Sequence, residues 1–442
     1  MRSYAEHQRA VHELLDPLAA RLEASGGRPV AVATGGVRGQ DAAGRVLARD
    51  VHSPAEIPGF DNSQMDGYAV RAHELAAARP GSPVHLAVGP TSAAGDAPFA
   101  LAPGTASPVM TGAVIPGGAD AVVPIEAADP SAFIGLGAGR HDSPAGSVVG
   151  FTAPVEPGAF IRRAGSDIAA GALLLAAGTR LGPAQLGSLA SAGVTEVPVR
   201  RRLRVLLVST GHELQAPGAP LRPGRIHDAN TAMLGAALRG CGVEVVEALA
   251  PDDAASVRAV LEASAPAVDL VVTTGGVSAG AFEVVREALA PLGVEFVKVA
   301  IQPGGPQGLG TARLGSGGPA GAGRADARGH DAVEVPVVSF PGNPVSALVS
   351  FELFLRPVLR RLEGLAPDRH RARLPLAHDV VSPRAKHQVR RGVIDGAGAV
   401  EVGAPSSHLL HAYAQATVLV HLPVGVDALP AGAAVDVWRI DD

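Results

Sequence analysis

Two carboxylates stand close together in a segment that is otherwise rich in apolar side chains. The stretch FDNSQMDGYAV, from Phe60 to Val70, contains Asp61 and Asp66. A solvated loop does not need the Met and Tyr of this stretch, and a core strand does not tolerate carboxylates unless they are paired or bound to something. The segment therefore predicts a functional site.

Three segments in the second half of the chain combine glycine with hydroxyl or amide side chains, directly after an apolar run. They are STGHEL (209–214), TTGGVSAG (273–280) and FPGNPVS (340–346). Glycine lets the backbone approach a ligand closely, and free N–H groups at the start of a helix bind anions such as phosphate. In the third loop Asn343 can cap a helix whose first residue is Pro344. These loops predict an anion site, although any strand-to-helix turn favours the same residue types.

Carboxylates near these loops could hold a divalent cation. Glu213, Asp228 and Glu283 are hard oxygen ligands of the kind that suits Mg²⁺, which usually also binds phosphate oxygens. For any one of these acids, a helix cap or a solvated helix residue is the more common role. The chain has no dinucleotide-binding G-x-G-x-x-G and no Walker lysine motif, so hydride transfer and P-loop chemistry are disfavoured.

Two further segments could meet an anionic substrate. PVMTGAVIPGGADAVVPIE (108–126) predicts a turn-rich β segment in which Thr111 and Gly112 offer a hydroxyl and backbone amides. RAKHQVRRGV (384–393) is basic enough to face an anion, although a solvated strand face is the more common role. VRRRLRV (199–205) is typical of a solvated lead-in to a strand.

The elements that must position these loops alternate in type from Leu203 onward. Strands are predicted at 203–210, 243–249, 268–276, 294–301 and 335–340. Helices are predicted at 230–240, with Asn230 as a plausible N-cap, and at 252–264, 278–293 and 343–362. This order predicts a doubly wound, mainly parallel α/β sheet. In such sheets ligands bind outside the carboxyl ends of the strands, where the three loops would lie.

The remaining sequence predicts a multidomain α/β plus β protein. We expect an elongated N-terminal domain from 1–50 and 150–202, an inserted β-rich domain at 51–149, the α/β domain at 203–365 and a small β-barrel-like domain at 366–442. Residues 315–332 are of low complexity and predict a flexible surface insertion, whose role the sequence does not indicate.

Composition excludes several classes of protein. The formal net charge of −5 and the low aromatic content, with one Trp and three Tyr, disfavour a nucleic-acid partner. The single cysteine excludes a disulfide framework and fits a reducing compartment. The charged start predicts an amphipathic helix and not a signal peptide, and no apolar run would span a bilayer. We therefore expect a soluble cytoplasmic protein with no membrane partner.

Together these segments resemble the molybdopterin molybdenumtransferase family, which is related to the C-terminal domain of gephyrin. The resemblance covers nearly the whole chain and follows the family's order of motifs. Its segments are FDNSQMDGYAV, MTGAVIPGGADAVVPIE, RRAGSDI, STGHEL, IHDANTAML, TTGGVSAG, KVAIQPGGPQGLG and FPGNPVSA.

The resemblance implies a transferase of molybdenum cofactor biosynthesis that acts as a homodimer, the α/β domain of one subunit forming a cleft with the N-terminal region of the other. With Mg²⁺, it would insert molybdate into adenylylated molybdopterin and release AMP. The implied catalytic residues are Asp61, Asp66, Thr111 and Asp167, and the implied metal ligands are Glu213, Asp228 and Glu283. The implied substrate-binding residues are Ser209, Thr210, Gly211, Glu213, Asn230, Gly275, Gly276, Ser278, Lys298, Pro341, Gly342, Asn343, Pro344 and Arg391.

Some positions depart from the family pattern. Gln302 and Gly305 stand where lysines are common, although Lys298 remains, and His212 and Ala281 replace more usual polar or acidic residues. These losses favour a second hypothesis, a molybdopterin-binding carrier or scaffold without turnover. A third, the preceding adenylyl transfer step, does not explain the long N-terminal half. No residue decides between molybdate and tungstate.

Overall fold

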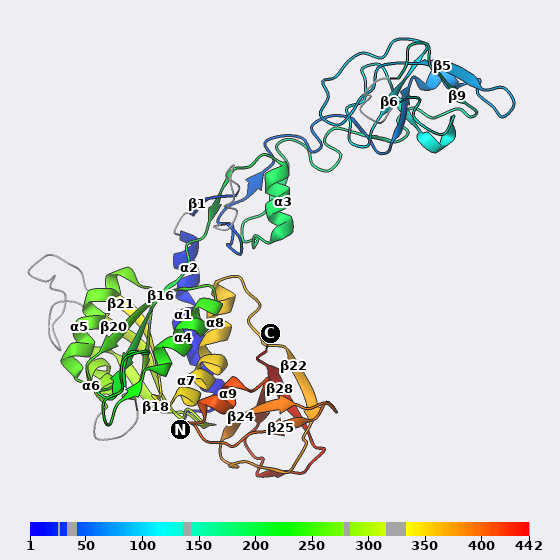
Figure 1. Ribbon diagram of the computed structural model, residues 1–442. Coiled ribbons are helices and arrows are strands. Elements are labelled where there is room, and N and C mark those ends of the chain that lie inside the picture. Colours follow the sequence, from blue (N-terminus) through cyan, green and yellow to red (C-terminus); the bar gives the residue numbers. More distant parts are fainter. Residues whose placement is uncertain (25–26, 33–41, 136–142, 278–282, 315–332, 442) are drawn as a thin grey trace, which may run out of the picture. The chain divides into compact units, whose positions relative to one another are not determined.

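The computed structural model describes residues 1–24, 27–32, 42–135, 143–277, 283–314 and 333–441 (Figure 1). The chain forms two compact units, one made of Met1–Gly27 with Arg200–Asp442 and the other of Arg28–Val199. The finer division into four domains stays a prediction. The predicted insertion at 315–332 lies outside the described residues.

The larger unit is built on a six-stranded sheet. Its order is β16 (Glu244–Ala250), β13 (Arg204–Thr210), β17 (Leu270–Thr274), β21 (Val333–Phe340), β20 (Pro306–Leu314) and β18 (Val294–Lys298). The first four strands are parallel, and β20 runs antiparallel to both neighbours. The predicted doubly wound α/β sheet is confirmed. Strand β20 was not predicted, because its glycine-rich PQGLG start offers no continuous apolar run.

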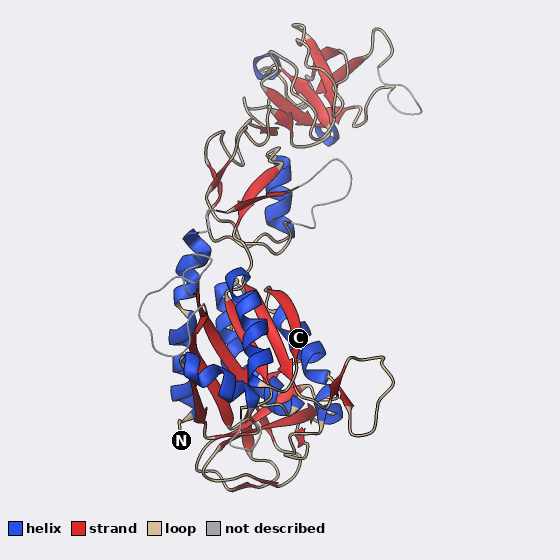
Figure 2. Cartoon of the chain, turned by 90° about the vertical axis from the view of Figure 1, so that its left-hand side faces the viewer, coloured by secondary structure: helices blue, strands red, loops and turns tan. Residues whose placement is uncertain are grey.

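Helices cover both faces of this sheet (Figure 2). They are α4 (Ala229–Gly240), α5 (Ala254–Ser264), α6 (Val284–Leu289), α7 (Pro344–Ser350) and α8 (Arg356–Leu362), with a π-helical turn at Phe351–Leu355 between the last two. Alternate side chains of a strand face opposite sides of a sheet. Accordingly, Val205 and Leu207 of β13 pack with α4, α7 and α8, whereas Leu206 and Val208 pack with α5 and α6. The near-continuous apolar runs of the sequence reflect this double burial.

The start of α4 differs from the prediction. The N-cap is Asp228, whose Oδ1 accepts the Thr231 N–H at 3.0 Å. Asn230 is the second residue of the helix and not its cap. Asp and Asn both favour N-cap positions. Asp228 is the cap because its carboxylate stands three positions before the Thr231 N–H that it accepts. This leaves the Asn230 amide available for contacts outside the helix.

Two short helices, α1 (Tyr4–Leu15) and α2 (Pro17–Ala24), belong to the same unit. A capping box starts α1: Ser3 Oγ accepts the Glu6 N–H at 3.2 Å, and Glu6 Oε2 accepts the Ser3 N–H at 2.7 Å. Val11 and Leu15 are fully buried in the core that also contains α4, α7 and α8. The amphipathic N-terminal helix predicted from the sequence therefore covers one face of the α/β sheet.

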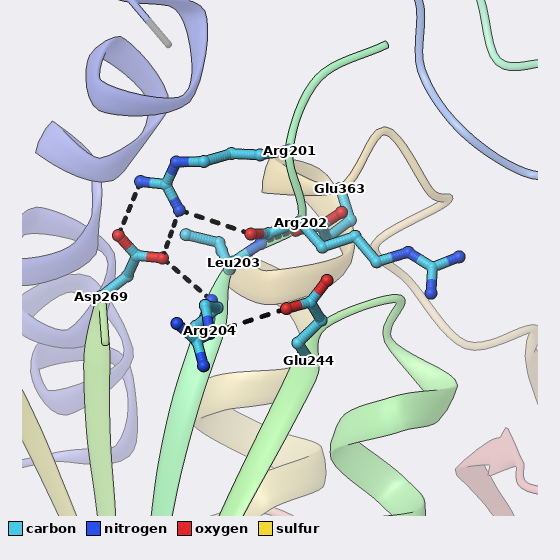
Figure 3. Close-up of polar contacts among 7 residues, drawn as sticks. All are labelled: Arg201, Arg202, Leu203, Arg204, Glu244, Asp269 and Glu363. Carbon is cyan, nitrogen blue, oxygen red and sulfur yellow. Dashed lines mark hydrogen bonds and ion pairs between the residues drawn. The ribbon is translucent and has the colours of Figure 1, made fainter. Parts of the chain in front are cut away.

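A polar cluster anchors the chain where it enters β13 (Figure 3). The Arg201 guanidinium binds Asp269 with two hydrogen bonds of 2.6 and 2.7 Å, and Asp269 Oδ2 also accepts the Arg204 N–H at 2.9 Å. Glu363 Oε1 accepts the Leu203 N–H at 2.8 Å. The segment leads into β13 and its arginines are partly exposed, as predicted. The sequence did not indicate that Arg201 pairs with Asp269, which directly precedes β17. The cluster joins the amino ends of two adjacent strands.

A second six-stranded arrangement follows the α/β part. Its order is β19 (Ile301–Gln302), β24 (His387–Ile394), β26 (Val418–Leu422), β28 (Ala434–Arg439) and β22 (Arg371–Pro375), with β25 (Val400–Val402) paired to β24. Beside it lie α9 (Leu410–Ala414) and the pair β23 (Val380–Val381) and β27 (Ala428–Leu429). A separate short pair joins β14 (Leu214–Gln215) to β15 (Ile226–His227). The predicted change to short strands after 365 is thus observed.

The smaller unit is mostly β structure. Its main sheet has the order β7 (Ala121–Pro124), β4 (Gly67–Val70), β6 (Thr105–Val109), β5 (Val84–Val88), β9 (Val148–Phe151) and β8 (Ala128–Asp129). Two-stranded pairs join β1 (Arg28–Ala31) to β12 (Glu196–Val199), β2 (Val51–His52) to β11 (Leu173–Leu175) and β3 (Asn62–Ser63) to β10 (Ile161–Arg162). The one longer helix described in this unit is α3 (Pro183–Ser191). The opening stretch thus forms β3, β4 and the turn between them.

Across the described residues, we find no helix with the length and apolar character needed to cross a membrane.

His7 is a fully buried polar residue of α1. Its ring lies edge-on to Phe354 with centroids 4.6 Å apart, and neither ring nitrogen has a hydrogen-bond partner among the described residues. Burial, followed by the nearby Arg2 charge, lowers the pKa of His7 from 6.5 to about 4. The folded protein therefore holds this imidazole neutral.

We predict that His7→Leu reduces the acid sensitivity of the fold. Between pH 6.5 and about 4 the unfolded chain binds a proton at His7 that the folded chain excludes. The resulting stability is complete above pH 6.5 and falls as the pH drops, by about 3 kcal/mol at pH 4. Urea unfolding from pH 7 to 4 should show a smaller loss in His7→Leu. The control is His370→Leu, because His370 is exposed. The assignment would be contradicted if the free energy of unfolding fell equally steeply with pH in both variants.

Candidate functional site

The three glycine-containing loops meet at the carboxyl edge of the α/β sheet. Gly275, with φ +97°, lies close to the end of β13. A Cβ on Gly275 would stand 2.9 Å from the Thr210 carbonyl oxygen. A Cβ on Gly342 would lie 3.4 Å from Gly275 Cα. Gly276, with φ +57°, packs closely against the start of α6. A Cβ on Gly276 would lie 2.8 Å from Val285 N. Glycine is required at 275 and 276 by both conformation and close approach.

Asn230 joins these loops. Its Nδ2 donates to Thr274 Oγ1 at 2.8 Å and to the Gly342 carbonyl at 2.7 Å. Its Oδ1 is buried without a hydrogen-bond partner among the described residues. Next to it, the hydroxyls of Ser209 and Thr231 are 2.7 Å apart. The N-terminal turn of α4 therefore holds the loops after β13, β17 and β21 in one constellation.

The predicted metal ligands have separate environments. Glu213 folds back on its own loop, and a Cβ on Gly211 would lie 2.7 Å from Glu213 Oε2. Asp228 is buried, and its Oδ2 accepts the Thr231 hydroxyl at 2.5 Å. Glu283 stands at the N-cap position of α6. Within the described part of the chain, no three His, Cys, Asp or Glu side chains come together as a metal-binding group, and the metal set stays a prediction.

Arg391 on β24 is a buried cation with unused donors. Its Nη2 donates to the carbonyls of Ala404 and Ser406, at 2.9 and 3.0 Å. Its Nε and Nη1 are buried and have no hydrogen-bond partner among the described residues. Burial lowers the pKa of Arg391. The alternative of a solvated strand face was wrong, because Arg390 is 8% and Arg391 only 1% exposed.

The 404–407 segment connects Arg391 to the third loop. Asn343 stands at the N-cap position of α7, and Pro344 is the first helical residue, as predicted. The Asn343 side chain does not cap the helix; its Nδ2 donates to Ser407 Oγ at 3.1 Å. The segment 404–407 therefore contacts both groups: the Ser406 carbonyl accepts from the Arg391 guanidinium, and Ser407 Oγ accepts from Asn343 in the third loop.

Other predicted substrate residues lie at the same edge or outside the described residues. Lys298 is exposed at the carboxyl end of β18. Pro341 follows β21, and its carbonyl accepts a long 3.4 Å contact from Thr274 Oγ1. In the segment that lacks the family's lysines, Gln302 Oε1 accepts from Gln388 Nε2 at 2.9 Å. Ser278 lies outside the described residues.

In the smaller unit, Asp61 is paired with Arg163. Asp61 Oδ2 accepts Arg163 Nη1 at 2.6 Å, and Oδ1 accepts the Ala164 N–H at 2.8 Å. The backbone hydrogen bond, helped by Arg163, lowers the pKa of Asp61, which therefore stays charged. Sequence analysis did not single out Arg163. Arg163 lies in the RRAGSDI segment, which could have indicated it. The pairing of β3 with β10 is what brings Arg163 close to Asp61.

Asp66 and Thr111 form a second polar pair. Asp66 Oδ1 accepts both the Thr111 N–H, at 2.7 Å, and the Thr111 hydroxyl, at 2.9 Å. Asp167 is exposed, and its backbone N–H donates to the Ile57 carbonyl at 2.9 Å. The two acids of the opening stretch are thus held by different partners, and both are accessible enough to meet a ligand.

Comparisons with known proteins agree across the whole chain. Residues 2–193 match the family model described as the MoeA N-terminal region (domain I and II), and residues 206–361 match the probable molybdopterin binding domain. The chain is 44% identical, over 100% of both chains, to molybdopterin molybdenumtransferase 2 of Mycobacterium tuberculosis. This chain belongs to the molybdopterin molybdenumtransferase family.

Further members and a solved structure are similar. Molybdopterin molybdenumtransferase of Synechococcus elongatus is 36% identical, covering 89% of this chain and 91% of that one. The crystal structure of a molybdopterin biosynthesis moea protein from Pyrococcus horikosii superposes with a TM-score of 0.73 at 30% identity, over 96% of this chain and 98% of that one. The family membership predicted from the motifs is confirmed.

We predict that Asn230→Ala destabilises the larger unit more than Asn343→Ala. The first change leaves two loop acceptors without their buried donor and should lower the free energy of unfolding by about 1–3 kcal/mol. The second removes one exposed hydrogen bond and should cost about 0.5 kcal/mol or less. Urea unfolding measures both. Equal losses would show that Asn230 does not hold the loops together.

Proposed function

We propose that this chain inserts molybdate into adenylylated molybdopterin, with Mg²⁺, and releases AMP. The observation that carries the proposal is the convergence of three strand-end loops at one edge. The segment 404–407 links this edge to Arg391, a buried arginine whose Nε and Nη1 have no hydrogen-bond partner among the described residues. Membership in a family of transferases of molybdenum cofactor biosynthesis supports turnover. The non-catalytic carrier is therefore not favoured, despite the missing lysines.

In the proposal, the loops bind the adenylate. Backbone N–H groups of glycine-containing loops and of helix starts favour a phosphate group. The residues that would line this part of the site are Ser209, Thr210, Gly211, Gly275, Gly276, Ser278, Pro341, Gly342, Asn343 and Pro344. Asn230 would set their spacing. A site whose dipoles are held in place before the reaction stabilises developing charge with little reorganisation.

Mg²⁺ would bind with substrate oxygens completing its shell. Mg²⁺ commonly takes one or two carboxylates together with phosphate oxygens and water, so a cluster of three acids is not required. Glu213, turned back over Gly211, is the first candidate, with Asp228 and Glu283 as further ligands. When bound, the ion would neutralise charge on the leaving phosphate.

Molybdate, as a substrate, needs cationic donors. Two buried donor nitrogens of Arg391, Nε and Nη1, have no partner among the described residues, and a charge-assisted hydrogen bond from such a donor to an oxyanion is strong. Lys298, at the carboxyl end of β18, adds a second positive charge and would compensate for Gln302 and Gly305.

The smaller unit would supply carboxylates that orient water or molybdate. Asp61, whose pKa is lowered by the Ala164 N–H and Arg163, would carry this role, with Asp66, Thr111 and Asp167 as the further catalytic residues that the resemblance implies. We further propose a homodimer, as the family resemblance implies. A cytoplasmic location fits the single cysteine.

We predict that purified protein releases AMP from adenylylated molybdopterin with Mg²⁺ only when molybdate is added. Asp61→Asn should keep the circular dichroism spectrum and molybdopterin binding but lower AMP release about 100-fold or more, because it loses a group that orients a reactant. The exposed Asp96→Asn in the same unit is the matched control.

Two outcomes would count against this proposal. Tight binding of the adenylate without AMP release, with or without molybdate, would favour the carrier. Loss of folding together with activity in Asp61→Asn would assign this carboxylate a structural role through Arg163 and Ala164.

We also predict that Arg391→Lys raises the molybdate concentration for half-maximal AMP release about 10-fold or more. Lysine keeps the charge but lacks the planar fork of N–H donors, and one lost charged hydrogen bond corresponds to about that factor. The control is Arg373→Lys, an exposed residue paired with Asp436 at 3.5 Å. An unchanged molybdate dependence in both variants would remove Arg391 from the molybdate site.

A further inference from the structure

The segment 298–305 carries one cation of the proposed molybdate site, Lys298. Lys298 is exposed and is the last residue of β18, an edge strand of the six-stranded sheet. Gln302 and Gly305, in the same segment, carry no charge. The position of the Lys298 backbone therefore decides where the one ammonium group of this segment can lie.

The outer side of this edge is paired with Arg2. The Arg2 N–H donates to the Lys298 carbonyl at 2.9 Å, and the Ala300 N–H donates to the Arg2 carbonyl at 2.8 Å. These two bonds flank Val299, which is fully buried and pairs with Arg2 in parallel orientation. On its inner side, Lys298 pairs with Pro306 of β20. Because an edge strand otherwise presents unpaired backbone groups, Arg2 extends the pairing of the sheet at Lys298.

Helix α1 holds Arg2 in place. The capping box between Ser3 and Glu6 starts this helix at the residue that follows Arg2. The Tyr4 ring stacks on the His387 ring of β24, with the centroids 4.8 Å apart and the planes 13° from parallel. The apolar face of α1 packs into the core of the larger unit. Arg2 is therefore attached to a fixed element of the fold.

The residues that follow Lys298 are held by a different element, β24. The His387 N–H donates to the Ala300 carbonyl at 2.9 Å. The side chains of Gln302 and Gln388 are joined by a hydrogen bond of 2.9 Å. These contacts begin two residues after Lys298. At Lys298 itself, the contact on the outer side comes from the N-terminal segment.

The Arg2 side chain makes a separate contact with β18. Its Nη2 lies 2.8 Å from Glu295 Oε2, and the Glu295 side chain is 62% exposed. Exposed ion pairs contribute little to stability. The backbone hydrogen bonds are therefore the contact that fixes Lys298, and the ion pair can be removed without removing them.

We propose that Arg2 is a positioning residue for molybdate binding, and that its backbone acts through Lys298. The inference rests on the proposed function, in which Lys298 supplies positive charge to molybdate. Ordering a flexible group on binding costs free energy, so a cation whose backbone is fixed beforehand gives more affinity. Arg2 provides this order from a segment some 296 residues away in the chain.

The test compares wild type with Arg2→Pro, because proline has no N–H to donate to the Lys298 carbonyl. All proteins carry the same N-terminal tag, so that Met1 stays in place. Isothermal titration calorimetry with molybdate, in the presence of Mg²⁺, measures affinity, and amide hydrogen exchange of Ala300 measures the backbone pairing. We expect the Kd for molybdate and the Ala300 exchange rate each to rise about 2- to 10-fold, as loss of one backbone hydrogen bond predicts.

Two further variants separate positioning from a general structural effect. Lys298→Gln should raise the Kd for molybdate about 10-fold or more, and Arg2→Pro should then add no further loss. Glu295→Gln removes the ion pair but no backbone donor and should match wild type in both measurements. Circular dichroism and the urea unfolding midpoint check that every variant folds.

Several outcomes would overturn the inference. They are an unchanged molybdate affinity in Arg2→Pro, an equal loss from Arg2→Pro with and without Lys298→Gln, and an unchanged affinity in Lys298→Gln. Absence of molybdate binding to wild type would overturn it as well. Wild type that binds molybdate and shows the expected dependence on Arg2 and Lys298, but releases no AMP, would count against the proposed reaction and leave this inference supported.

Discussion

The parallel pairing of β13 with β17, and of β17 with β21, is the constraint on which the rest of the larger unit depends. Parallel strands end at the same edge, so three segments separated by some 60 residues each arrive side by side. The helices that return the chain cover both faces of the sheet and bury most of β13, β17 and β21. The carboxyl edge of the sheet is therefore the part where backbone N–H groups and polar side chains remain available to a ligand.

Contact among the three loops demands specific residues. Gly275 must approach the Thr210 carbonyl, and Asn230 must place one amide group between Thr274 and Gly342. An unpaired buried amide oxygen in the same side chain is unfavourable by itself. Its retention at this edge is consistent with a site that a ligand completes, and the same holds for the two unused donors of Arg391.

The polar groups at the two edges of the sheet differ in their hydrogen bonding. At the amino edge, Arg201 and Asp269 satisfy each other with two short hydrogen bonds and fix the point where the chain enters β13 (Figure 3). At the carboxyl edge, the buried Asn230 Oδ1 has no hydrogen-bond partner among the described residues. The first arrangement stabilises the fold, and the second leaves a polar atom that a ligand can satisfy.

The sequence by itself determined the fold class, because apolar runs and helical periodicity alternate in a way that only an α/β sheet accommodates. It also determined the loops, since glycine next to a strand end is a local requirement. Tertiary structure alone decided the partners. Asp228 rather than Asn230 caps α4, Arg163 meets Asp61 from 102 residues away, and Arg391 is buried rather than solvated. Strand pairing and burial act between segments distant in the chain, so spacing within one segment does not encode them.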